Sequence, residues 1–321
     1  MKLNNIVFLG TPQFAVPCLI KLSQTGFKPV LCITQPDKAK GRKKVLSPPE
    51  VKIAALDLNI PVLQPEDINS VEILQILSDL KPDLIITVAY GGYLKKNIRK
   101  LPKFGCINLH PSLLPKYRGS SPVNSALFSG DKFTGNTIFK IVAKMDAGPI
   151  LLQTNTQILP NENYTKLQER LAESGALSIV DLMYQIENEV KSDLNELSTY
   201  RIQKADNATF SGKIHKEDLV LNWNSAAEEI CNKVRGLAFK PGVVCTFRDK
   251  KIKIIQTEMT DNKSKLSPGT VSEIVKNVGV FVSTQTTDIL LKLVQPAGKK
   301  IMSSHSYNLG AKIQVGEKFG L

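Results

Sequence analysis

Residues 107–119, INLHPSLLPKYRG, place polar side chains where an apolar, strand-like run gives way to a loop braced by prolines. Alternate residues of a strand point to the same side, so Asn108 and His110 would face one spot. An amide and an imidazole aimed at one point suit the stabilisation of negative charge on a carbonyl oxygen during acyl transfer. The alternative is a strand-end histidine bonded to nearby backbone, beside an asparagine in a turn. These residues alone leave both interpretations open.

Strand and helix signals alternate on either side of this stretch. Helical spacing of apolar residues covers 16–22 and 71–80. The predicted strands are 6–9, 30–34, 83–89, 106–110 and 137–142. This alternation predicts an α/β fold whose largely parallel sheet is covered on both faces. Ligands bind beyond the carboxyl ends of such strands, so we expect Gly10, His110 and Asp146 to share one rim.

Asp146 lies in KMDAGPI, a sequence typical of a turn. An aspartate in a turn often only accepts hydrogen bonds from backbone N–H groups. Beside His110, its carboxylate would instead favour the imidazolium and could accept a proton. The sequence does not decide whether the two side chains meet.

The second half of the chain has a different pattern. Residues 162–190 have the spacing of a long helix, and the polar stretch 191–208 reads as a linker. Beyond it, residues 209–321 contain a helix-like piece at 225–234 and several short strands. Those strands are 243–247, 251–257, 269–275, 279–283 and 289–293, with hairpin turns at 248–250 and 276–277. We therefore expect a small OB-like β-barrel, an architecture that often binds nucleic acid.

A basic segment, DKAKGRKKVLSPP at 37–49, is the second informative stretch. It reads as a flexible loop whose cations repel one another unless an anion such as phosphate is present. Arg42 can make bidentate contacts that a lysine cannot. The net charge of +13 agrees with a polyanionic partner, although a solvated loop is the alternative. Its basic residues are Lys38, Lys40, Arg42, Lys43 and Lys44.

Several classes of protein are disfavoured. No apolar run is long enough for a membrane span or a signal peptide, so a cytoplasmic protein without a membrane partner is expected. The five cysteines are widely spaced and the chain has three histidines, which argues against a disulfide framework and against a metal site. Gly10-Thr11-Pro12 matches neither a dinucleotide nor a nucleoside-triphosphate loop; it is a ligand-facing turn or a helix N-cap.

Six stretches together carry a more specific signal than any one of them: FLGTPQFA (8–15), TQPDKAKGRKK (34–44), VAYG (88–91), INLHPSLLPKYRGSSPV (107–123), KMDAGPIL (144–151) and QPAGKKIMS (295–303). With them the chain resembles the methionyl-tRNA formyltransferase family over nearly its whole length. The SLLPKYRG part alone indicates the wider folate-dependent formyltransferases. The GTPQFA turn, the basic segment and QPAGKK point to the tRNA-specific members.

The resemblance implies a Rossmann-like catalytic domain at 1–190, a linker at 191–208 and an OB-like tRNA-binding domain at 209–321. It implies 10-formyltetrahydrofolate as formyl donor, initiator methionyl-tRNA as acceptor, no metal, and a monomer. By position, Asn108, His110 and Asp146 match the catalytic trio. Ser112, Leu113, Leu114 and Pro115 match the folate-binding segment, and the basic residues of 38–44 match the loop that enters the acceptor end of the tRNA.

The mechanism that the resemblance suggests is direct attack of the neutral α-amine on the formyl carbon. Asn108 and His110, the latter as imidazolium, would hold the oxyanion, and Asp146 would raise the pKa of His110. Two alternatives keep part of this account. A formyltransferase for an amino sugar or other small amine would keep the trio without needing the basic segment. An RNA-binding protein without activity would not need the trio.

The chain departs from the family pattern at three places. Members commonly carry Asn-Pro-Trp-Pro after an arginine of the C-terminal helix, whereas Arg235 is followed here by GLAFKPG. Some members have glycine at the position of Pro111, and some have aspartate at that of Pro149. The first departure concerns barrel packing or tRNA contact, and the other two lie beside catalytic positions without replacing them.

Overall fold

A computed structural model describes residues 2–40 and 45–320, and the chain divides into two compact units. The N-terminal unit runs to Pro122 and includes Thr134–Gln157 and Gln168–Ser211. The C-terminal unit consists of Val123–Phe133, Ile158–Leu167 and the chain from Gly212 onward. The boundaries that we expect for a linker, 191–208, stay a prediction.

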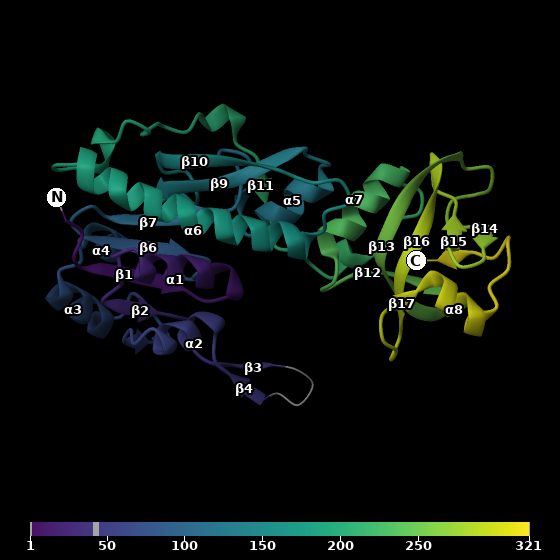
Figure 1. The fold of residues 1–321 in the computed structure, drawn as a ribbon, viewed down its shortest axis with the longest axis horizontal. Coiled ribbons are helices and arrows are strands. Elements are labelled where there is room, and N and C mark those ends of the chain that lie inside the picture. The colour runs from purple at the N-terminus through teal and green to yellow at the C-terminus, as the bar shows by residue number, and fades with distance from the viewer. Residues whose placement is uncertain (1, 41–44, 321) are drawn as a thin grey trace. The chain divides into compact units, whose positions relative to one another are not determined.

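The N-terminal unit is built on a seven-stranded sheet of order β10-β9-β7-β6-β1-β2-β5 (Figure 1). The pairs from β5 to β7 are all parallel, and β9 is antiparallel to β7. The mostly parallel sheet that the sequence predicts is therefore confirmed. The strands are β1 (Ile6–Gly10), β2 (Leu31–Ile33), β5 (Val62–Leu63), β6 (Leu84–Val88), β7 (Cys106–His110), β9 (Phe133–Lys140) and β10 (Ile150–Gln157).

Helices cover this sheet because the strands are apolar on both faces. Every residue of β1 and β6 is buried. Val7, Leu9 and Ile85 pack with Ile73 of α3 and Ile98 of α4 in one core cluster. The helices of this part of the chain are α1 (Val16–Gln24), α2 (Glu50–Asp57), α3 (Val71–Leu80), α4 (Lys96–Lys100), α5 (Pro122–Phe128) and α6 (Tyr164–Glu189), with a short 3-10 turn at Gln13–Ala15.

The long helix α6 lies against β7 and β9. Asn136 of β9 donates its amide to the carbonyl of Leu171 at 3.0 Å, and a Cβ at Gly175 would meet Leu109 of β7 at 2.7 Å. Tyr184 at the other end of the helix donates to the carbonyl of Thr25 at 3.3 Å, which places α6 beside α1 (Figure 1). The predicted helix at 162–190 is thus confirmed.

The polar stretch after α6 is not an unstructured connection. It contains the 3-10 turns Leu194–Glu196 and Ala205–Asn207 and the short strand β11 (Phe210–Ser211). β11 pairs in parallel with β8 (Arg118–Gly119), the last part of the proline-braced loop. Few large apolar residues mark this segment, so periodicity could not reveal that pairing.

The basic segment has more structure than the flexible loop that we expected. β3 (Lys38–Lys40) and β4 (Val45–Ser47) pair as an antiparallel hairpin. Asp37 at its base binds the ammonium of Lys52 at 2.9 Å, and both Val45 and Leu46 are exposed. The ends of the segment are therefore tied together by backbone hydrogen bonds.

The C-terminal unit is an antiparallel half-barrel. Its main path has the order β14-β15-β16-β13-β12-β18, and β17 pairs with β16 (Figure 1). A bridge between Thr270 and Lys318 links the chain before β14 to the chain before β18. The strands are β12 (Val243–Phe247), β13 (Lys250–Lys263), β14 (Val271–Val275), β15 (Gly279–Val282), β16 (Thr287–Pro296), β17 (Met302–Ser303) and β18 (Phe319–Gly320). This architecture agrees with the predicted OB-like barrel.

From Gly212 onward this unit also contains the short turn η4 (Glu217–Leu219) and the helices α7 (Ala227–Leu237) and α8 (Ser304–Ala311). All of α5 except Pro122 belongs to the same unit. Trp223 is buried beside Phe319, with ring centroids 5.7 Å apart, so the single tryptophan of the chain packs in the core of this unit. The segment after Arg235 packs without the tryptophan common in the family. Leu237 and Ala238 are buried, and the carbonyl of Gly236 accepts the amide of Asn124 at 2.7 Å.

Ser70 caps the first turn of α3, and its loss should weaken the N-terminal unit. Its hydroxyl accepts the backbone N–H of Ile73 at 3.3 Å. We expect Ser70→Ala to reduce the free energy of unfolding by about 1 kcal/mol, because an N–H at the helix start loses its acceptor. Ser78→Ala, an exposed change in the same helix, is the matched control. Urea unfolding of both variants measures the difference, and equal midpoints would contradict the capping role.

Candidate functional site

The candidate site lies where β1, β6 and β7 end. Gly10, Val88 and His110 are their last residues, and the three strands are parallel neighbours. The hydroxyl of Thr11 donates to the carbonyl of Tyr90 at 2.9 Å, which ties two of the following loops together. Pro12, not Thr11, occupies the N-cap position of the turn that follows, so the N-cap alternative is wrong. Gly10 and His110 therefore lie at the carboxyl ends of parallel strands in the same sheet, as predicted.

Asp146 reaches this rim by a different route from the one expected. β9 runs antiparallel to β7, with Lys140 opposite Ile107 and Thr137 opposite His110. The carboxyl end of β9 therefore lies beside the start of β7, away from His110. The loop 141–149 brings Asp146 back to His110. The antiparallel direction of this strand was not visible in its apolar pattern.

Asn108 presents its amide group at the site. It is paired with Thr87 of β6 in the strand register. The hydroxyl of Thr87 donates to Oδ1 of Asn108 at 2.6 Å. This bond occupies the amide oxygen and leaves the amide nitrogen to be aimed elsewhere. Asn108 is half-buried, in contrast to the buried Leu109 and His110 that follow it.

His110 is held by a backbone carbonyl and faces a carboxylate. Its Nε2 lies 2.9 Å from the carbonyl oxygen of Tyr117. A carbonyl can only accept, so Nε2 carries a proton and donates it. Nδ1 faces Oδ2 of Asp146 at 3.8 Å, which is too long for a direct hydrogen bond. In the neutral ring, Nδ1 is therefore an available proton acceptor beside a carboxylate.

The protonation of His110 differs from the imidazolium that the resemblance suggests. The side chain is only 4% exposed. Burial lowers the pKa of His110 below its ordinary value of 6.5, and the negative charge of Asp146 opposes only part of that decrease. Removing the charged ring from water costs more free energy than the attraction of Asp146 restores, because the carboxylate makes no direct contact with the ring. The balance of these effects favours the neutral imidazole.

Asp146 is fixed by a tight turn and by the loop that contains β8. Its backbone has the left-handed φ of 49°, a conformation that non-glycine residues adopt rarely. Its Oδ2 accepts the backbone N–H of Gly119 at 2.8 Å. A Cβ at Gly148, two residues later, would lie 1.7 Å from the carbonyl oxygen of Lys140, so only glycine fits this turn. The structure thus brings Asn108, His110 and Asp146 to one place.

The segment Ser112, Leu113, Leu114 and Pro115 forms the loop beside the trio. Ser112 is fully buried, and its hydroxyl donates to the carbonyl of Lys116 at 2.6 Å. Leu114 packs in a small cluster with Phe139 and Ile150. Leu113 and Pro115 are half-buried. The buried members brace the loop, so the half-buried members are those that can contact a ligand.

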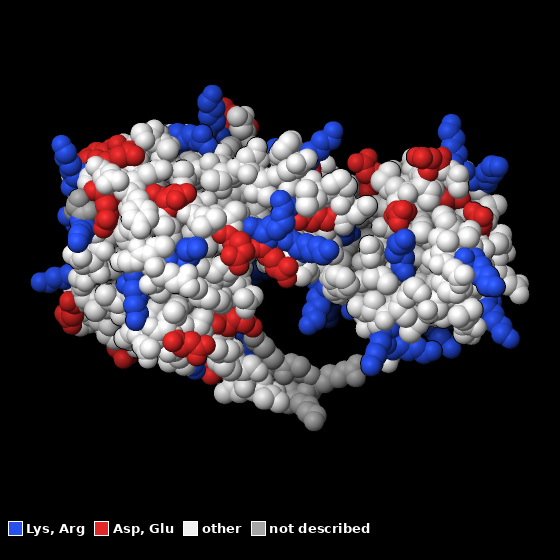
Figure 2. Space-filling model, viewed as in Figure 1, with Lys and Arg blue, Asp and Glu red and all other residues white. Residues whose placement is uncertain are grey.

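The basic segment lies only partly within the described structure. Lys38 and Lys40 belong to β3. Arg42, Lys43 and Lys44, which we predict to bind tRNA, fall outside the described residues. Figure 2 shows acidic side chains interspersed among the basic ones on the visible face of each unit.

Two buried residues of the site were not identified by sequence reasoning. Arg118 is 3% exposed, and both its Nε and its Nη2 donate to Oε1 of Gln203, at 3.1 and 2.7 Å. The amide nitrogen of Gln203 donates to the carbonyls of Asp146 and Gly148, at 2.9 and 2.7 Å. Arg118 belongs to the stretch 107–119, which also contains Asn108 and His110. Gln203 lies in a polar segment without apolar periodicity, and no sequence pattern distinguishes it from its neighbours.

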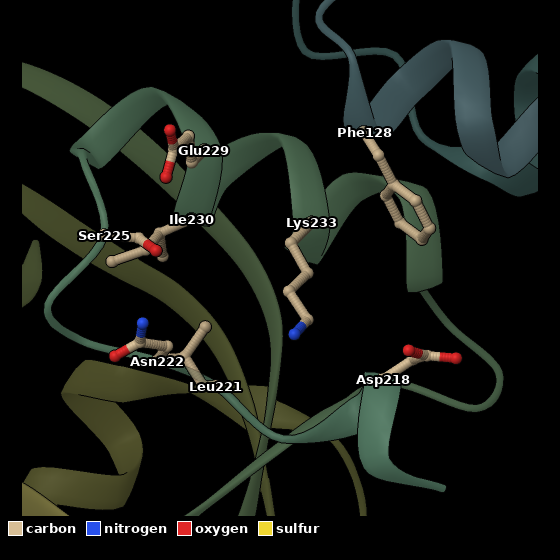
Figure 3. Close-up of a pocket in the computed structure, with 8 residues that line it drawn as sticks. All are labelled: Phe128, Asp218, Leu221, Asn222, Ser225, Glu229, Ile230 and Lys233. Atoms are coloured by element: carbon tan, nitrogen blue, oxygen red, sulfur yellow. The ribbon is translucent and has the colours of Figure 1, made fainter. Parts of the chain in front are cut away.

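A cavity of about 320 Å³ lies elsewhere, in the C-terminal unit (Figure 3). Figure 3 shows Lys233 extending from α7 toward the segment that carries Asp218. The ammonium of Lys233 donates to the carbonyl of Val220 at 2.7 Å. Burial lowers the pKa of Lys233, and Asp218 opposes the decrease. None of the trio lines this cavity, so it is not the candidate site.

Other chemistry finds less support in the residues that the structure describes. Within 2–40 and 45–320, no group of three or more His, Cys, Asp and Glu side chains is placed to hold a metal ion. Among these same residues, no helix has both the length and the apolar character to cross a membrane. The five cysteines are free thiols, and burial raises the pKa of Cys106, near the site in sequence, to about 12.

Comparison with known proteins identifies relatives for the whole chain. Residues 4–182 match the family described as formyl transferase, and residues 213–312 match its C-terminal domain. The chain is 37% identical over 319 residues to a methionyl-tRNA formyltransferase of Lysinibacillus sphaericus (strain C3-41), covering 99% of this chain and 100% of that one. It is 38% identical over 320 residues to a methionyl-tRNA formyltransferase of Bacillus subtilis (strain 168), covering 99% and 98%.

The fold is similar to that of a solved sugar formyltransferase. The structure of WlaRD, a sugar 3N-formyl transferase in the presence of dTDP and 5-N-formyl-THF, superposes with a TM-score of 0.62. The two chains are 18% identical, and the match covers 94% of this chain and 100% of that one. At this identity the likeness establishes a shared fold.

Proposed function

The chain belongs to the methionyl-tRNA formyltransferase family, and we propose that it transfers a formyl group from 10-formyltetrahydrofolate to the α-amine of initiator methionyl-tRNA. Full-length relatives at 37% and 38% identity carry that name. The observation that carries the proposal is the meeting of Asn108, His110 and Asp146 at the end of β7. An amide donor beside a histidine–carboxylate pair suits the transfer of an acyl group to an amine.

The loop beside the trio and the chemistry of the trio both support a folate formyl donor. Leu113 and Pro115 offer half-buried apolar surface in the loop that follows β7, the strand that carries Asn108. The sugar formyltransferase of the same fold was crystallised with 5-N-formyl-THF, a related folate. We infer that the loop 112–115 lines the pterin site and that Asn108 lies nearest the formyl oxygen. No metal is required by this chemistry, because the residues supply both the hydrogen-bond donor and the proton acceptor.

Asn108 acts on the negative charge that develops when the amine attacks. Its amide nitrogen, oriented by the bond from Thr87 to its oxygen, donates to the oxyanion of the tetrahedral intermediate. The bond that forms joins the methionyl nitrogen to the formyl carbon, and the bond that breaks joins that carbon to the folate nitrogen. Asn108 needs no change of protonation for this role.

His110 and Asp146 move the proton that this exchange requires. The attacking amine must lose one proton, and the leaving folate nitrogen must gain one. Neutral His110 takes up the proton at Nδ1, directly or through water, and the carboxylate of Asp146 stabilises the resulting imidazolium. The same pair then returns the proton to the leaving nitrogen, so the enzyme ends in its starting state.

The tRNA is recognised through phosphate contacts outside the trio. The basic segment at 38–44 and the OB-like unit supply the cations, and the net charge of the chain is +13. We place the enzyme in the cytoplasm as a monomer, where its charged tRNA substrate is available. Residues 1–190, 191–208 and 209–321 remain our proposed catalytic domain, linker and tRNA-binding domain.

Transfer of a labelled formyl group from 10-formyltetrahydrofolate to charged initiator methionyl-tRNA tests the proposal. We expect labelled formylmethionyl-tRNA with the wild-type chain. Binding of tRNA without transfer would support an inactive RNA-binding protein instead, and it would contradict the proposed function.

Arg42→Ala should weaken use of the tRNA without weakening use of the folate. We expect kcat/KM for methionyl-tRNA to fall by roughly tenfold, as loss of one phosphate contact predicts, and its dependence on log salt to decrease by about one unit. The Kd for the folate, measured by calorimetry, should stay within about twofold of wild type by the same reasoning. Lys100→Ala, which removes an exposed charge from α4, is the control. Equal loss of folate binding would overturn this division of roles.

A further inference from the structure

We propose that Gln203 and its partner Arg118 are positioning residues that set the distance between Asp146 and His110. This inference rests on the proposed function, because it assigns the trio its chemical role. It assigns a structural role to the segment 199–211, which the sequence pattern indicates only as a polar connection. We refer to this segment as the strap.

The strap is bonded along its length to the loops of the site. Arg201 exchanges two backbone hydrogen bonds with Ile150, at 2.8 and 2.9 Å. Phe210 and Ser211 pair with Arg118 and Gly119 as β11 and β8. A Cβ at Gly119 would lie 2.1 Å from the carbonyl oxygen of Ser211, so the two segments approach as closely as glycine permits. All of these residues belong to the N-terminal unit.

Gln203 acts on Asp146 through the backbone of its turn. Its one amide group donates to the carbonyls of Asp146 and Gly148 at 2.9 and 2.7 Å, on both sides of Ala147. Such a clamp resists rotation of the turn in which Asp146 holds its left-handed φ of 49°. The carboxylate then points to the N–H of Gly119 and to His110.

Arg118 in turn fixes Gln203. Two of its nitrogens donate to the same amide oxygen, and both side chains are at least nine-tenths buried. A buried guanidinium without partners is costly, so the pair determines which way the amide of Gln203 faces. With the oxygen engaged by Arg118, only the N–H donors can face the turn of Asp146.

A second arm of the strap reaches His110. Thr209 accepts the backbone N–H of Tyr117 with its hydroxyl oxygen at 2.9 Å, and its carbonyl accepts the N–H of Arg118 at 2.9 Å. The carbonyl of Tyr117 is the acceptor that keeps the proton of His110 on Nε2. Ser211 donates its hydroxyl to the same carbonyl at 3.2 Å. The strap therefore holds both partners of the histidine–carboxylate pair.

The position of Asp146 can be measured through His110, independently of activity. The chain has three histidines, and His215 and His305 lie in the C-terminal unit, so the ring of His110 can be assigned by comparison with His110→Ala. The carboxylate of Asp146 raises the pKa of His110 against the effect of burial. Displacement of Asp146 must therefore lower that pKa, and Asp146→Asn gives the limit in which the charge is absent.

The test uses two substitutions of Gln203 in the full chain, followed by NMR titration and by steady-state kinetics. Gln203→Met removes both hydrogen bonds to the turn and the acceptor of Arg118, without adding charge. We expect it to lower the pKa of His110 toward the value in Asp146→Asn and to reduce kcat by about 10- to 100-fold, as expected for misplacement of a reacting group by a fraction of an ångström to one ångström. Gln157→Met, an exposed change on β10 of the same unit, should leave both quantities unchanged.

Gln203→Glu keeps the inference testable if the methionine variant does not fold. Its carboxylate retains the partner of Arg118, and it replaces the N–H donors to the turn by an oxygen that repels the carbonyls of Asp146 and Gly148. We expect a KM for the folate within about twofold and a kcat reduced by about tenfold, because reaction geometry and not binding is affected.

Wild-type kcat in Gln203→Glu, or an unchanged His110 pKa in a folded Gln203→Met, would overturn the positioning role. Failure of the wild-type chain to formylate tRNA would refute the proposed function instead. The titration of His110 would still report whether Gln203 holds Asp146 in place.

Discussion

His110→Ala should reduce kcat for formyl transfer by about 10²–10⁴-fold, the range for loss of a positioned general base. The substitution removes the ring whose Nδ1 faces Asp146, while the loop 112–115 keeps its own bonds to Thr137 and Lys116. Folate affinity should therefore be almost unchanged. Single-turnover transfer to charged tRNA, with folate binding measured by calorimetry, separates the two effects. Wild-type turnover by the variant would contradict the assignment of His110.

The same residue predicts the pH dependence of the reaction. Because burial lowers the pKa of His110, the neutral base is present at pH 7 and is lost only as the pH falls through a value below 6.5. Activity at saturating substrate should therefore decrease on the acid side of pH 6.5. A folded-state pKa below the unfolded one also means that this residue contributes to a loss of stability as the pH falls below 6.5. An NMR titration of His110 above pH 6.5 would contradict the neutral-base mechanism.

Asn108→Ala should cost about 10²–10³-fold in kcat, as removal of one oxyanion donor does in other acyl-transfer enzymes. The amide of Asn108 is oriented by Thr87, whose hydroxyl lies 2.6 Å from Oδ1. Thr87→Val keeps the size of that neighbour and removes the orienting bond, together with the longer contact of the hydroxyl to the carbonyl of Ile107 at 3.1 Å. It should give a smaller rate loss in the same direction. Both effects belong to the transition state, which predicts lower kcat with little change in KM.

The comparison of these two variants gives a strict control. If the amide were only a structural partner of Thr87, both substitutions would weaken the site equally and would lower the melting temperature in parallel. A rate loss in Asn108→Ala that is no larger than that in Thr87→Val would therefore refute the oxyanion role.

Much of the fold could be predicted because local patterns and tertiary structure agree. The helix at 71–80 and the strands at 106–110 and 243–247 have the predicted bounds. The turn at 248–250 is also confirmed, since Arg248 and Asp249 both have positive φ, as a two-residue hairpin requires. In each case apolar periodicity ends at polar turn residues, so the local signal and the packing coincide.

The parts that could not be predicted depend on contacts between distant residues. The antiparallel direction of β9 is set by its pairing with β7, which an apolar run cannot indicate. Gln203 finds Arg118 across 85 positions of the chain. The protonation of His110 depends on how deeply the ring is buried, and a strand-end position in the sequence gives no depth. The clustering of the trio was expected from the strand ends and from the resemblance, and its geometry required the structure.

The most direct test of the account is the specificity of formyl transfer among acceptors. The measurement is kcat/KM with 10-formyltetrahydrofolate for four acceptors: initiator methionyl-tRNA, elongator methionyl-tRNA, free methionine and an amino-sugar nucleotide. We predict selective formylation of the initiator, with the reaction lost in His110→Ala. Formylation of the amino sugar but not of the tRNA would contradict the account, because the trio would then serve a small amine and the basic segment would have no part in the reaction.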